Sequence, residues 1–356
     1  MRKVFFQLVD TLEMGGAERM SINIAAVMAQ NGFESHLIVS RRTGGMSAHV
    51  PDNVHLHLLN KKAFYDLNAF YKLFNLKRKY NPSILHAHST SIFWAVFLKI
   101  LSGRFLLVWH DHFGLSDQLE KYPRKEIVIL AKWIDRIICV NDKLTSYWKH
   151  LLPYREKDIE TIKNFPYLIL QNQVKIKPFT FLHLANFRKQ KNHLNLVKAV
   201  SILAEKRVDF QIVLVGELVE QGVKNEVSEE IDKLNLNHLI SIHGPAEDVS
   251  VFLNSCHAGV LSSDSEGLPV ALLEYGLAGF PVACTDVGDC AKVISSIDFG
   301  FLVPPKDPLA LANALGEILD NPNNSLIKGK NLKEKIQKEY GADAFYENYL
   351  NLVQKE

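Results

Sequence analysis

Short apolar runs alternate with longer amphipathic stretches along the first half of the chain. After the first run, the turn Glu13–Gly16 leads into a stretch with helical spacing at 17–30, and Gly32 precedes the second run. Such an alternation predicts a parallel sheet with helices on both faces. We expect the strands of this half at 4–9, 35–39, 54–58, 84–87, 105–109 and 136–140.

The same alternation restarts after Pro166 and the polar run 171–177, which we interpret as a linker. The sequence therefore predicts two Rossmann-like, doubly wound α/β domains, an N-terminal one over 1–166 and a C-terminal one over 167–339. Two such domains in tandem place a ligand cleft at the carboxyl ends of their strands. The tail, 340–356, carries an aromatic amphipathic pattern typical of a helix. The strands of the second half are expected at 179–184, 210–215, 239–242, 258–261, 281–284 and 301–303.

The stretch 262–288 holds the clearest candidate site. A polar turn follows an apolar run, Pro269 stands where a helix would begin, and Gly279 follows its last apolar position. Free N–H groups at such a helix N-terminus attract anions, while Glu266 and Glu274 can accept hydrogen bonds from hydroxyls. The combination fits a ligand with a phosphate and many hydroxyls, such as a nucleotide sugar. The alternative is an ordinary crossover helix with two solvated acids.

Composition limits the class of protein. The chain has 356 residues, of which 47% are hydrophobic, and this suits a globular protein of two domains. No run approaches the roughly 18 apolar residues of a membrane span. Asp10 and Glu13 interrupt the apolar start, so we interpret it as a strand and not as a signal peptide. The four cysteines lack metal-type spacing, which indicates reduced core residues of a cytoplasmic protein.

Charge is spread unevenly. Residues 1–170 carry 23 Lys and Arg against 15 Asp and Glu, and the remainder carries 18 against 24. A basic first half indicates an anionic partner, either a phosphorylated acceptor or a membrane surface. We do not expect nucleic acid as a partner, because no recognition motif accompanies the charge.

The stretch 61–80 gives this basic half a second interpretation. It places Phe64, Leu67, Tyr71 and Phe74 on one stripe of a helix that ends in a basic cluster. Such a stripe can lie on a membrane interface, which would suit a lipid-linked acceptor. The alternative is a stripe that covers the sheet as part of the core, with the lysines solvated.

Taken together, a series of short motifs closely resembles the retaining family-4 (group 1) glycosyltransferases, which have the two-domain GT-B fold. The resemblance runs over nearly the whole chain. It implies that a nucleotide sugar binds mainly to the C-terminal domain, that an acceptor binds mainly to the N-terminal domain, that the tail helix packs back on the latter, and that the anomeric configuration is retained. The motifs are G-G-A-E-R at 15–19, H-A-H-S at 86–89, W-H-D-H at 109–112, Q-K-N-H at 190–193, V-L-V-G-E at 213–217, H-G-P at 243–245, E-G-L-P at 266–269 and G-F-L-V-P-P at 300–305.

Candidate phosphate ligands come from both domains. Breaking a glycosyl–phosphate bond builds negative charge on the leaving diphosphate, which fixed donors must stabilise. Gly15 and Gly16 allow a close backbone approach just before a helix, and Lys191 can supply a point charge. The chain departs from the family at Asn186, where an arginine is usual. Arg188 either supplies that charge or points to solvent.

The resemblance assigns further roles around the donor. It places Glu274 against the ribose hydroxyls and Glu266 against the donor sugar near the reacting carbon. It also places the backbone N–H groups of Gly267 and Leu268 against sugar or phosphate oxygens. Arg19 either reaches an acceptor phosphate or is an ordinary surface residue.

Histidines supply the remaining candidates. His110 matches the family histidine that hydrogen-bonds the donor sugar, and His112 is the alternative, because both lie on the same side of an extended segment. Asp111 would point the other way and is interpreted as structural. We interpret His86 and His88 as packing or hydrogen-bonding residues at a strand end.

No metal or cofactor is predicted. No D-x-D follows a strand, and no His, Asp or Glu cluster has ligand spacing along the sequence. The lack of G-x-G-x-x-G argues against a dehydrogenase. We predict a cytoplasmic enzyme, either free or at the inner face of the plasma membrane, that moves a hexose-type sugar from a UDP- or GDP-sugar to a glycan or lipid-linked acceptor during capsule or lipopolysaccharide assembly. The alternatives are a nucleotide-sugar epimerase of the same fold and a non-catalytic sugar-binding relative.

Overall fold

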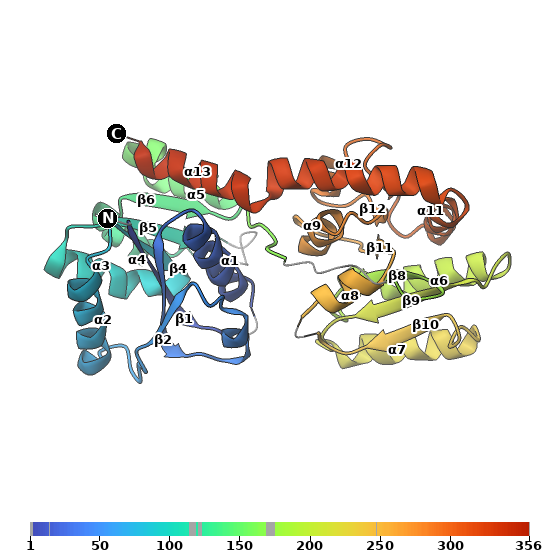
Figure 1. The fold of residues 1–356 in the computed structure, drawn as a ribbon, viewed down its shortest axis with the longest axis horizontal. Coiled ribbons are helices and arrows are strands. Elements are labelled where there is room, and N and C mark those ends of the chain that lie inside the picture. The colour runs from blue at the N-terminus through green and yellow to red at the C-terminus, as the bar shows by residue number, and fades with distance from the viewer. Residues whose placement is uncertain are drawn as a thin grey trace. The chain divides into compact units, whose positions relative to one another are not determined.

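Two compact units make up the chain. The computed structural model describes residues 3–13, 15–113, 119, 123–168, 175–246 and 248–355. One unit comprises residues 1–165 with 342–356, and the other comprises residues 166–341. Each has its own parallel sheet covered by helices (Figure 1). The two doubly wound α/β folds that the sequence predicts are confirmed. Among the described helices, none combines the length and the apolar character needed to cross a membrane.

The first unit has a seven-stranded sheet in the order β3-β2-β1-β4-β5-β6-β7. Its strands are β1 (Val4–Thr11), β2 (Glu34–Arg42), β3 (His55–Leu58), β4 (Ile84–His88), β5 (Leu106–Asp111), β6 (Arg136–Cys139) and β7 (Ile159–Thr161). Its α-helices are α1 (Gly16–Gln30), α2 (Leu67–Tyr80), α3 (Ile92–Ser102), α4 (Lys125–Leu130), α5 (Asp142–Leu151) and α13 (Ala342–Gln354), and short 3₁₀ helices include η1 (Gly45–His49), η2 (Ser89–Ser91), η4 (Ala131–Trp133) and η5 (Pro153–Asp158). All strand pairs are parallel, so every strand ends at the same edge of the sheet.

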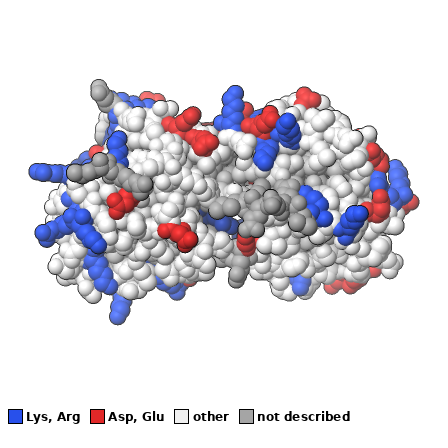
Figure 2. Space-filling view, viewed as in Figure 1, with Lys and Arg blue, Asp and Glu red and all other residues white. Residues whose placement is uncertain are grey.

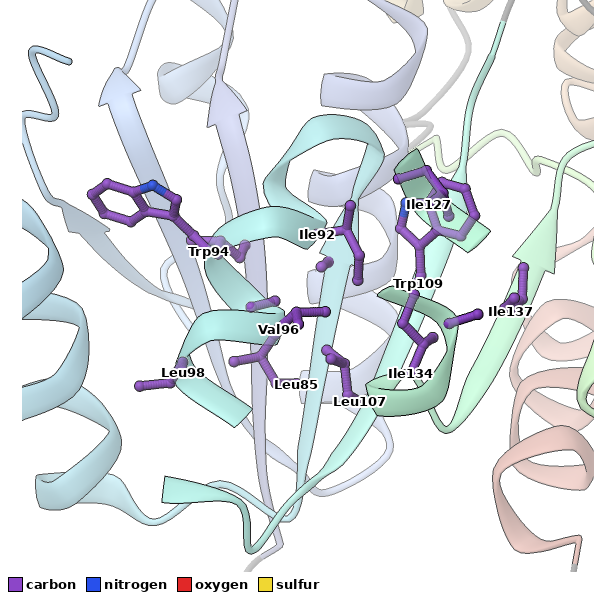
Figure 3. Packing of buried hydrophobic residues seen from close by; sticks show 14 of the residues in the cluster. Leu85, Ile92, Trp94, Val96, Leu98, Leu107, Trp109, Ile127, Ile134 and Ile137 are labelled. Carbon is purple, nitrogen blue, oxygen red and sulfur yellow. The ribbon is translucent and has the colours of Figure 1, made fainter. Parts of the chain in front are cut away.

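One face of the central strands forms the core of this unit. Because side chains alternate along a strand, apolar residues of β4, β5 and β6 face α3 while the residues between them face the other way. Burying each such side chain contributes about 1.5–3 kcal/mol. The alternation leaves His86, His88 and His110 on the opposite face. Figure 3 shows the packing of Leu85, Leu107, Trp109 and Ile137 from the strands with Ile92 and Val96 from α3.

The opposite face is covered by α1 and by the C-terminal helix α13. The ring of Tyr349 on α13 packs edge-on against Phe5 of β1, with 6.0 Å between ring centroids. Arg136 at the start of β6 donates from Nε to the Leu352 carbonyl at 2.8 Å. The extended backbone of Gly341 separates α13 from the preceding helix, so the tail helix begins at Ala342 and not at Tyr340.

The second unit has a six-stranded parallel sheet in the order β10-β9-β8-β11-β12-β13. Its strands are β8 (Phe179–Leu184), β9 (Phe210–Val215), β10 (Ile240–His243), β11 (Ala258–Leu261), β12 (Val282–Thr285) and β13 (Phe301–Val303). Its helices are η6 (Lys189–Lys191), α6 (His193–Ala204), α7 (Gln221–Lys233), α8 (Ser250–Ser255), α9 (Val270–Leu277), α10 (Cys290–Val293), α11 (Pro308–Asp320) and α12 (Pro322–Tyr340). All six of these strands lie where the apolar pattern predicts them, within a residue at each end.

Candidate functional site

The second sheet changes winding direction between β8 and β11, its two central strands. Loops that follow such neighbouring strands run in opposite directions and leave a crevice at the strand ends, where ligands of open α/β sheets bind. Here the loop after β8 carries Lys191 and the loop after β11 carries Glu266. The topology therefore brings two of the sequence candidates to one place.

Partly buried hydrogen bonds hold these two loops together. The Ser262 hydroxyl lies 3.1 Å from the carbonyl oxygens of Lys191 and of Asn192. The Asn192 side chain donates to Asp264 Oδ1 at 2.7 Å, and the Asp264 N–H donates to the Gln190 carbonyl at 2.8 Å. Both loops thus keep a defined position before any ligand arrives.

Lys191 and Glu266 form an ion pair inside this crevice. Lys191 Nζ lies 2.6 Å from Glu266 Oε1, and the Ser263 hydroxyl donates to the same oxygen at 2.6 Å. The Glu266 side chain is 7% exposed and that of Lys191 is 20% exposed, so little water screens the pair. Removing one partner of such a buried pair leaves an uncompensated charge. The pair is therefore a fixed feature of the crevice.

The segment after β12 supports the Glu266 turn from behind. Thr285 donates from Oγ1 to the Ser263 carbonyl at 2.7 Å, and the Asp289 N–H donates to the Gly267 carbonyl at 2.8 Å. Gly288 has φ +57°, and a Cβ there would lie 2.1 Å from the Glu266 carbonyl oxygen. Only glycine combines this backbone conformation with so close an approach. Ser263, Thr285 and Gly288 are supporting residues that the sequence pattern did not single out, although all three lie in the stretch 262–288.

The other donor-side candidates follow along the same chain segment. Gly267 is exposed, and nothing lies within 4 Å of a Cβ built on it. Leu268 packs partly into the core beneath α9, and Pro269 caps that helix. Glu274 is half-buried on the second turn of α9, next to the buried Tyr275. The open space above Gly267 is where a ligand could reach the backbone N–H groups of this turn.

Asn186 has a structural part in the loop after β8. Its Oδ1 accepts a hydrogen bond from the Glu217 N–H at 3.0 Å, which joins the loops after β8 and β9. Gly216 allows this contact, since a Cβ there would lie 2.0 Å from the Ala185 carbonyl oxygen. Arg188 is exposed at the start of the turn that leads to Lys191. An uncharged residue thus stands at 186, and the cations of this loop lie further along it.

The glycine turn of the first unit lies between β1 and α1. Gly15 is the N-cap of α1 and Gly16 its first residue, and both are exposed. The Glu18 carboxylate folds back over this helix start, so that a Cβ on Gly15 would lie 2.2 Å from Glu18 Oε2. Arg19 is half-buried in the first turn of α1. A negative charge already stands at this helix N-terminus, and an incoming phosphate would have to displace it.

Four histidines cluster where β4 and β5 end. His88 pairs in register with His110, and the aromatic rings of His110 and His112 have centroids 4.0 Å apart. His86 Nε2 lies 3.2 Å from His110 Nδ1, and His88 Nδ1 lies 3.0 Å from His112 Nε2. All four side chains therefore lie on one face of the sheet, as the alternation of strand positions requires.

Two further residues close the histidine network. Tyr349 of α13 places its hydroxyl 3.2 Å from His86 Nδ1, and the Gln7 side-chain oxygen lies 2.7 Å from His88 Nε2. Neither contact can be predicted from sequence spacing, because Gln7 and Tyr349 are both far along the chain from the histidines that they contact. The tail helix thus supplies a polar group to the buried cluster.

Burial keeps the cluster neutral. It lowers the pKa of His86 and of His112 to about 3, and it holds the pKa values of His88 and His110 well below the usual 6.5. Burial also raises the pKa of Tyr349, so its hydroxyl stays protonated and can donate to His86 Nδ1. In the arrangement where Tyr349 donates, His86 carries its proton on Nε2 and donates to His110 Nδ1. This order leaves the His110 proton on Nε2.

His110 and His112 differ in what they can offer a ligand. Among the described residues, His110 Nε2 is buried and has no hydrogen-bond partner. His112 Nε2 is engaged with His88. An unpartnered buried N–H is costly unless a ligand uses it. The geometry favours His110 over His112 as the binding residue.

Asp111 lies on the opposite face of β5 and is structural. Arg124 donates to both of its carboxylate oxygens at 2.6 Å, and Trp148 Nε1 donates to Oδ2 at 2.8 Å. Its side chain is 1% exposed. The paired charges hold the end of β5, which carries the histidines, against α5.

Although no cluster has metal-ligand spacing along the sequence, two sets of potential ligands lie close together in space. Ligand atoms of His86, His88 and His110 lie within 4.8 Å of one another, and so do those of Glu34, His36 and His55. Both sets come from neighbouring parallel strands, so their spacing arises from sheet register and not from sequence distance. In the first set the nitrogens of His86 and His88 are already engaged in the hydrogen bonds described above.

Comparison with known proteins gives a consistent result for both units. The model of the Glycosyltransferase Family 4 domain matches residues 14–165, and the model of Glycosyl transferases group 1 matches residues 169–339. An uncharacterized glycosyltransferase of Haemophilus influenzae is 21% identical over 99% of this chain and all of that protein. The UDP-Gal:alpha-D-GlcNAc-diphosphoundecaprenol alpha-1,3-galactosyltransferase of Escherichia coli is 23% identical over 91% of this chain and 92% of its own length.

A solved structure has the same fold. The Anabaena protein Alr3699/HepE, crystallised with UDP and glucose, superimposes with a TM-score of 0.72 at 17% identity, and the match covers all of both chains.

Proposed function

Because the chain belongs to the family-4, group 1 glycosyltransferases, we propose that it moves a hexose-type sugar from a UDP- or GDP-sugar to a glycan or lipid-linked acceptor, with retention of the anomeric configuration. Glycosyl transfer in glycan or polysaccharide synthesis is what the family membership supports. UDP is favoured because the similar Escherichia coli enzyme is a UDP-galactose-dependent galactosyltransferase and the similar Anabaena protein was crystallised with UDP. We further propose cell-surface polysaccharide assembly in the cytoplasm as its setting.

The observation that carries the proposal is the Lys191–Glu266 pair at the switch point of the second sheet. A diphosphate that enters this crevice offers Lys191 a second anion. When Lys191 turns to the phosphate, Glu266 keeps the Ser263 hydrogen bond, and its Oε1 loses the lysine and gains room for a hydrogen bond from a sugar hydroxyl. Binding the donor therefore converts one ion pair into two contacts with the ligand, one at each side of the bond that breaks.

The remaining residues have separate roles in this proposal. Glu274 accepts hydrogen bonds from the ribose hydroxyls, and the N–H groups of Gly267 and Leu268 meet sugar or phosphate oxygens. His110 donates from Nε2 to the donor sugar. Lys191 stabilises the charge that develops on the leaving diphosphate, as a fixed cation in a site with little water does most effectively. No metal or cofactor takes part in the proposed reaction.

The test is a turnover assay on matched variants. Glu266→Gln and Lys191→Met should each lower nucleoside diphosphate release in the presence of acceptor by about 100-fold or more, as the loss of one such electrostatic group does. Glu229→Gln, an exposed acid on α7, is the control and should retain full activity. Glu266→Gln with unchanged turnover would remove the basis of the proposal.

Product analysis separates the alternatives. A transferase releases one nucleoside diphosphate for each glycosylated acceptor, whereas an epimerase releases none and changes the sugar within the nucleotide sugar. A sugar-binding relative shows a nucleotide-sugar thermal shift without either product, because a ligand that binds only the folded state raises its stability. The shift measured with UDP-, GDP- and other nucleotide sugars also identifies the donor.

We propose in addition that the first unit contacts a membrane through α2 and α3. The predicted stripe is not core over most of its length, since Phe64, Leu67 and Tyr71 are 51%, 78% and 61% exposed, and only Phe74 packs on the core. The buried face of α2 carries Ala69 and Leu73 instead. The core alternative is therefore wrong for the first three residues of the stripe.

The neighbouring helix α3 extends this apolar surface. The rings of Phe70 on α2 and Phe97 on α3 have centroids 4.7 Å apart, so the helices lie side by side. On α3, Phe97, Ile100 and Leu101 are each about half exposed. Figure 2 shows Lys and Arg side chains projecting over the side of the first unit where α2 lies in Figure 1. Exposed apolar residues bordered by basic ones suit an anionic lipid surface.

Vesicle flotation tests the contact. Replacing the basic cluster 77–79 by alanine should weaken binding to anionic vesicles by about 100-fold, at roughly 1 kcal/mol for each basic residue. Leu67→Glu should also weaken it, while the triple alanine variant of Lys198, Lys233 and Lys338, exposed on the second unit, should bind as the wild type. Equal flotation of the 77–79 variant and the wild type would exclude this surface.

A further inference from the structure

A second cluster of titratable side chains lies at the outer edge of the first sheet, among residues that the proposed transfer does not use. Strand β3 is the edge strand and pairs in parallel with β2, with His36 in register with His55 and Ile38 in register with His57. Side chains alternate along each strand, so Glu34, His36, His55 and His57 all project from the same face. A carboxylate and three imidazoles thus meet on two neighbouring strands.

His36 lies at the centre of this cluster. It is fully buried, with Nε2 3.2 Å from Glu34 Oε1 and Nδ1 2.9 Å from His57 Nε2. The ring of His55 has its centroid 4.7 Å from that of His36. Glu34, His36 and His55 each offer one ligand atom, and the three atoms lie within 4.8 Å of one another. The ring of Tyr80, at the end of α2, lies tilted against that of His36, with 4.2 Å between the ring centroids.

We propose that Glu34, His36 and His55 bind a divalent transition-metal ion of the zinc type. Two imidazoles and a carboxylate are ligands that suit zinc and its neighbours better than magnesium or calcium. Small rotations of the two accessible side chains bring the ligand atoms to the spacing that metal–ligand bonds of about 2.0–2.2 Å require. His55 is exposed and the Glu34 side chain is 35% exposed, so the ion can enter from solvent and keep water in its open positions.

His57 completes the site without being a ligand. A histidine that binds a metal usually has its other ring nitrogen held by a second polar group, which fixes its orientation. His57 Nε2 is in that position relative to His36 Nδ1. When the metal binds His36 Nε2, the His36 proton moves to Nδ1 and forms a hydrogen bond to His57 Nε2. The proton of His57 then stands on its own Nδ1. Both rings stay neutral, and only their tautomers change.

The ion would join the edge strand to its neighbour. Edge strands present unpaired backbone groups and are the least protected part of a sheet. A metal that binds Glu34 and His36 on β2 together with His55 on β3 holds the two strands in register. Since it binds only the folded arrangement, it raises the stability of the first unit.

Titration of tag-free, metal-stripped protein with Zn²⁺ in competition with a chromophoric chelator tests the site, and Co²⁺ absorption reports the ligand geometry. We expect one ion per chain. His55→Ala and Glu34→Gln should each weaken its affinity by about 10-fold or more, and His57→Ala should weaken it by about 10–100-fold. His238→Ala, an exposed histidine on the second unit, is the control and should bind Zn²⁺ as the wild type does.

Because His55 is exposed and Glu34 is partly exposed, substitutions at these two ligands should leave the protein folded. His55→Ala removes an exposed side chain, so circular dichroism should match the wild type, and the rise in melting temperature on adding Zn²⁺ should be lost. Zn²⁺ bound with equal affinity by the wild type, His55→Ala and Glu34→Gln would overturn the proposal, as would the absence of binding tighter than about 1 mM in the wild type. Because the assay measures no turnover, its result is independent of the proposed transfer.

Discussion

Mild acid should destabilise the first unit steeply, because its core contains neutral histidines. His86, His88 and His110 are at most 1% exposed. Burial lowers the pKa of His86 to about 3 and holds those of His88 and His110 well below 6.5. In the unfolded chain each histidine titrates near its ordinary pKa of about 6.5. Between these values the unfolded state binds more protons than the folded one, so stability is lost as pH falls below about 6.5.

The magnitude follows from the number of histidines. Each buried neutral histidine contributes about 1.4 kcal/mol per pH unit below the unfolded pKa. Three of them lower the free energy of unfolding by about 4 kcal/mol between pH 7.5 and 5.5, against a typical total of about 5–15 kcal/mol. His112, whose pKa burial also lowers to about 3, acts in the same direction. Carboxylates near their ordinary pKa of about 4 stay ionised throughout this window and add little.

Tryptophan fluorescence isolates the unit concerned. All four tryptophans of the chain, at 94, 109, 133 and 148, lie in the first unit. Urea unfolding followed by their emission at pH 7.5, 6.5 and 5.5 therefore reports that unit alone. His150→Ala, which removes an exposed histidine from α5, should leave the pH dependence unchanged. A free energy of unfolding that changes by less than about 1 kcal/mol between pH 7.5 and 5.5 would refute the reasoning.

Three substitutions test the supporting contacts. Tyr349→Phe removes the hydroxyl that ends the histidine network and leaves the buried His86 Nδ1 without its partner, so we expect kcat/KM to fall by about 5–30-fold, which is about 1–2 kcal/mol, and the melting temperature to fall as well. Gly288→Ala should displace the Glu266 turn, so that turnover and nucleotide-sugar binding fall together in calorimetry while the protein remains folded. Asp111→Asn leaves the Arg124 charge without its partner, and urea unfolding should show a loss of about 3–5 kcal/mol.

The strands were predictable because nearly every one is a run of apolar residues between polar turns. The clearest exception is β7, whose Ile159, Glu160 and Thr161 include a single large apolar residue. It is the last strand of its sheet and pairs only with β6 among the described strands, so little of it has to be apolar. The face of α2 was harder to predict, since Leu67 and Tyr71 of the predicted stripe face outward, whereas Ala69 and Leu73 are buried and Phe74 packs on the core.

The candidate site was predictable only where its residues are close in sequence. Glu266 lies in a local motif, whereas its partner Lys191 is 75 residues earlier and reaches it through the order of strands in the sheet. The shared face of His110 and His112 follows from their spacing of two. Their contact with β4 depends on strand register, and the contribution of Tyr349 depends on the packing of the tail helix. These long-range relations are not encoded in any single stretch.

The departure from the family at Asn186 gains a physical interpretation from its hydrogen bond. An arginine at 186 could not accept the Glu217 N–H, so the loops after β8 and β9 would need another connection there. With asparagine in place, Lys191 is the half-buried cation of the crevice, and its charge is balanced by Glu266. In the proposed reaction, one cation, Lys191, serves both Glu266 and the arriving diphosphate. Binding of the diphosphate and the contact of Glu266 with the sugar are therefore coupled. In this proposal the arriving phosphate draws Lys191 away from Glu266 Oε1, so the donor itself releases this oxygen for the sugar.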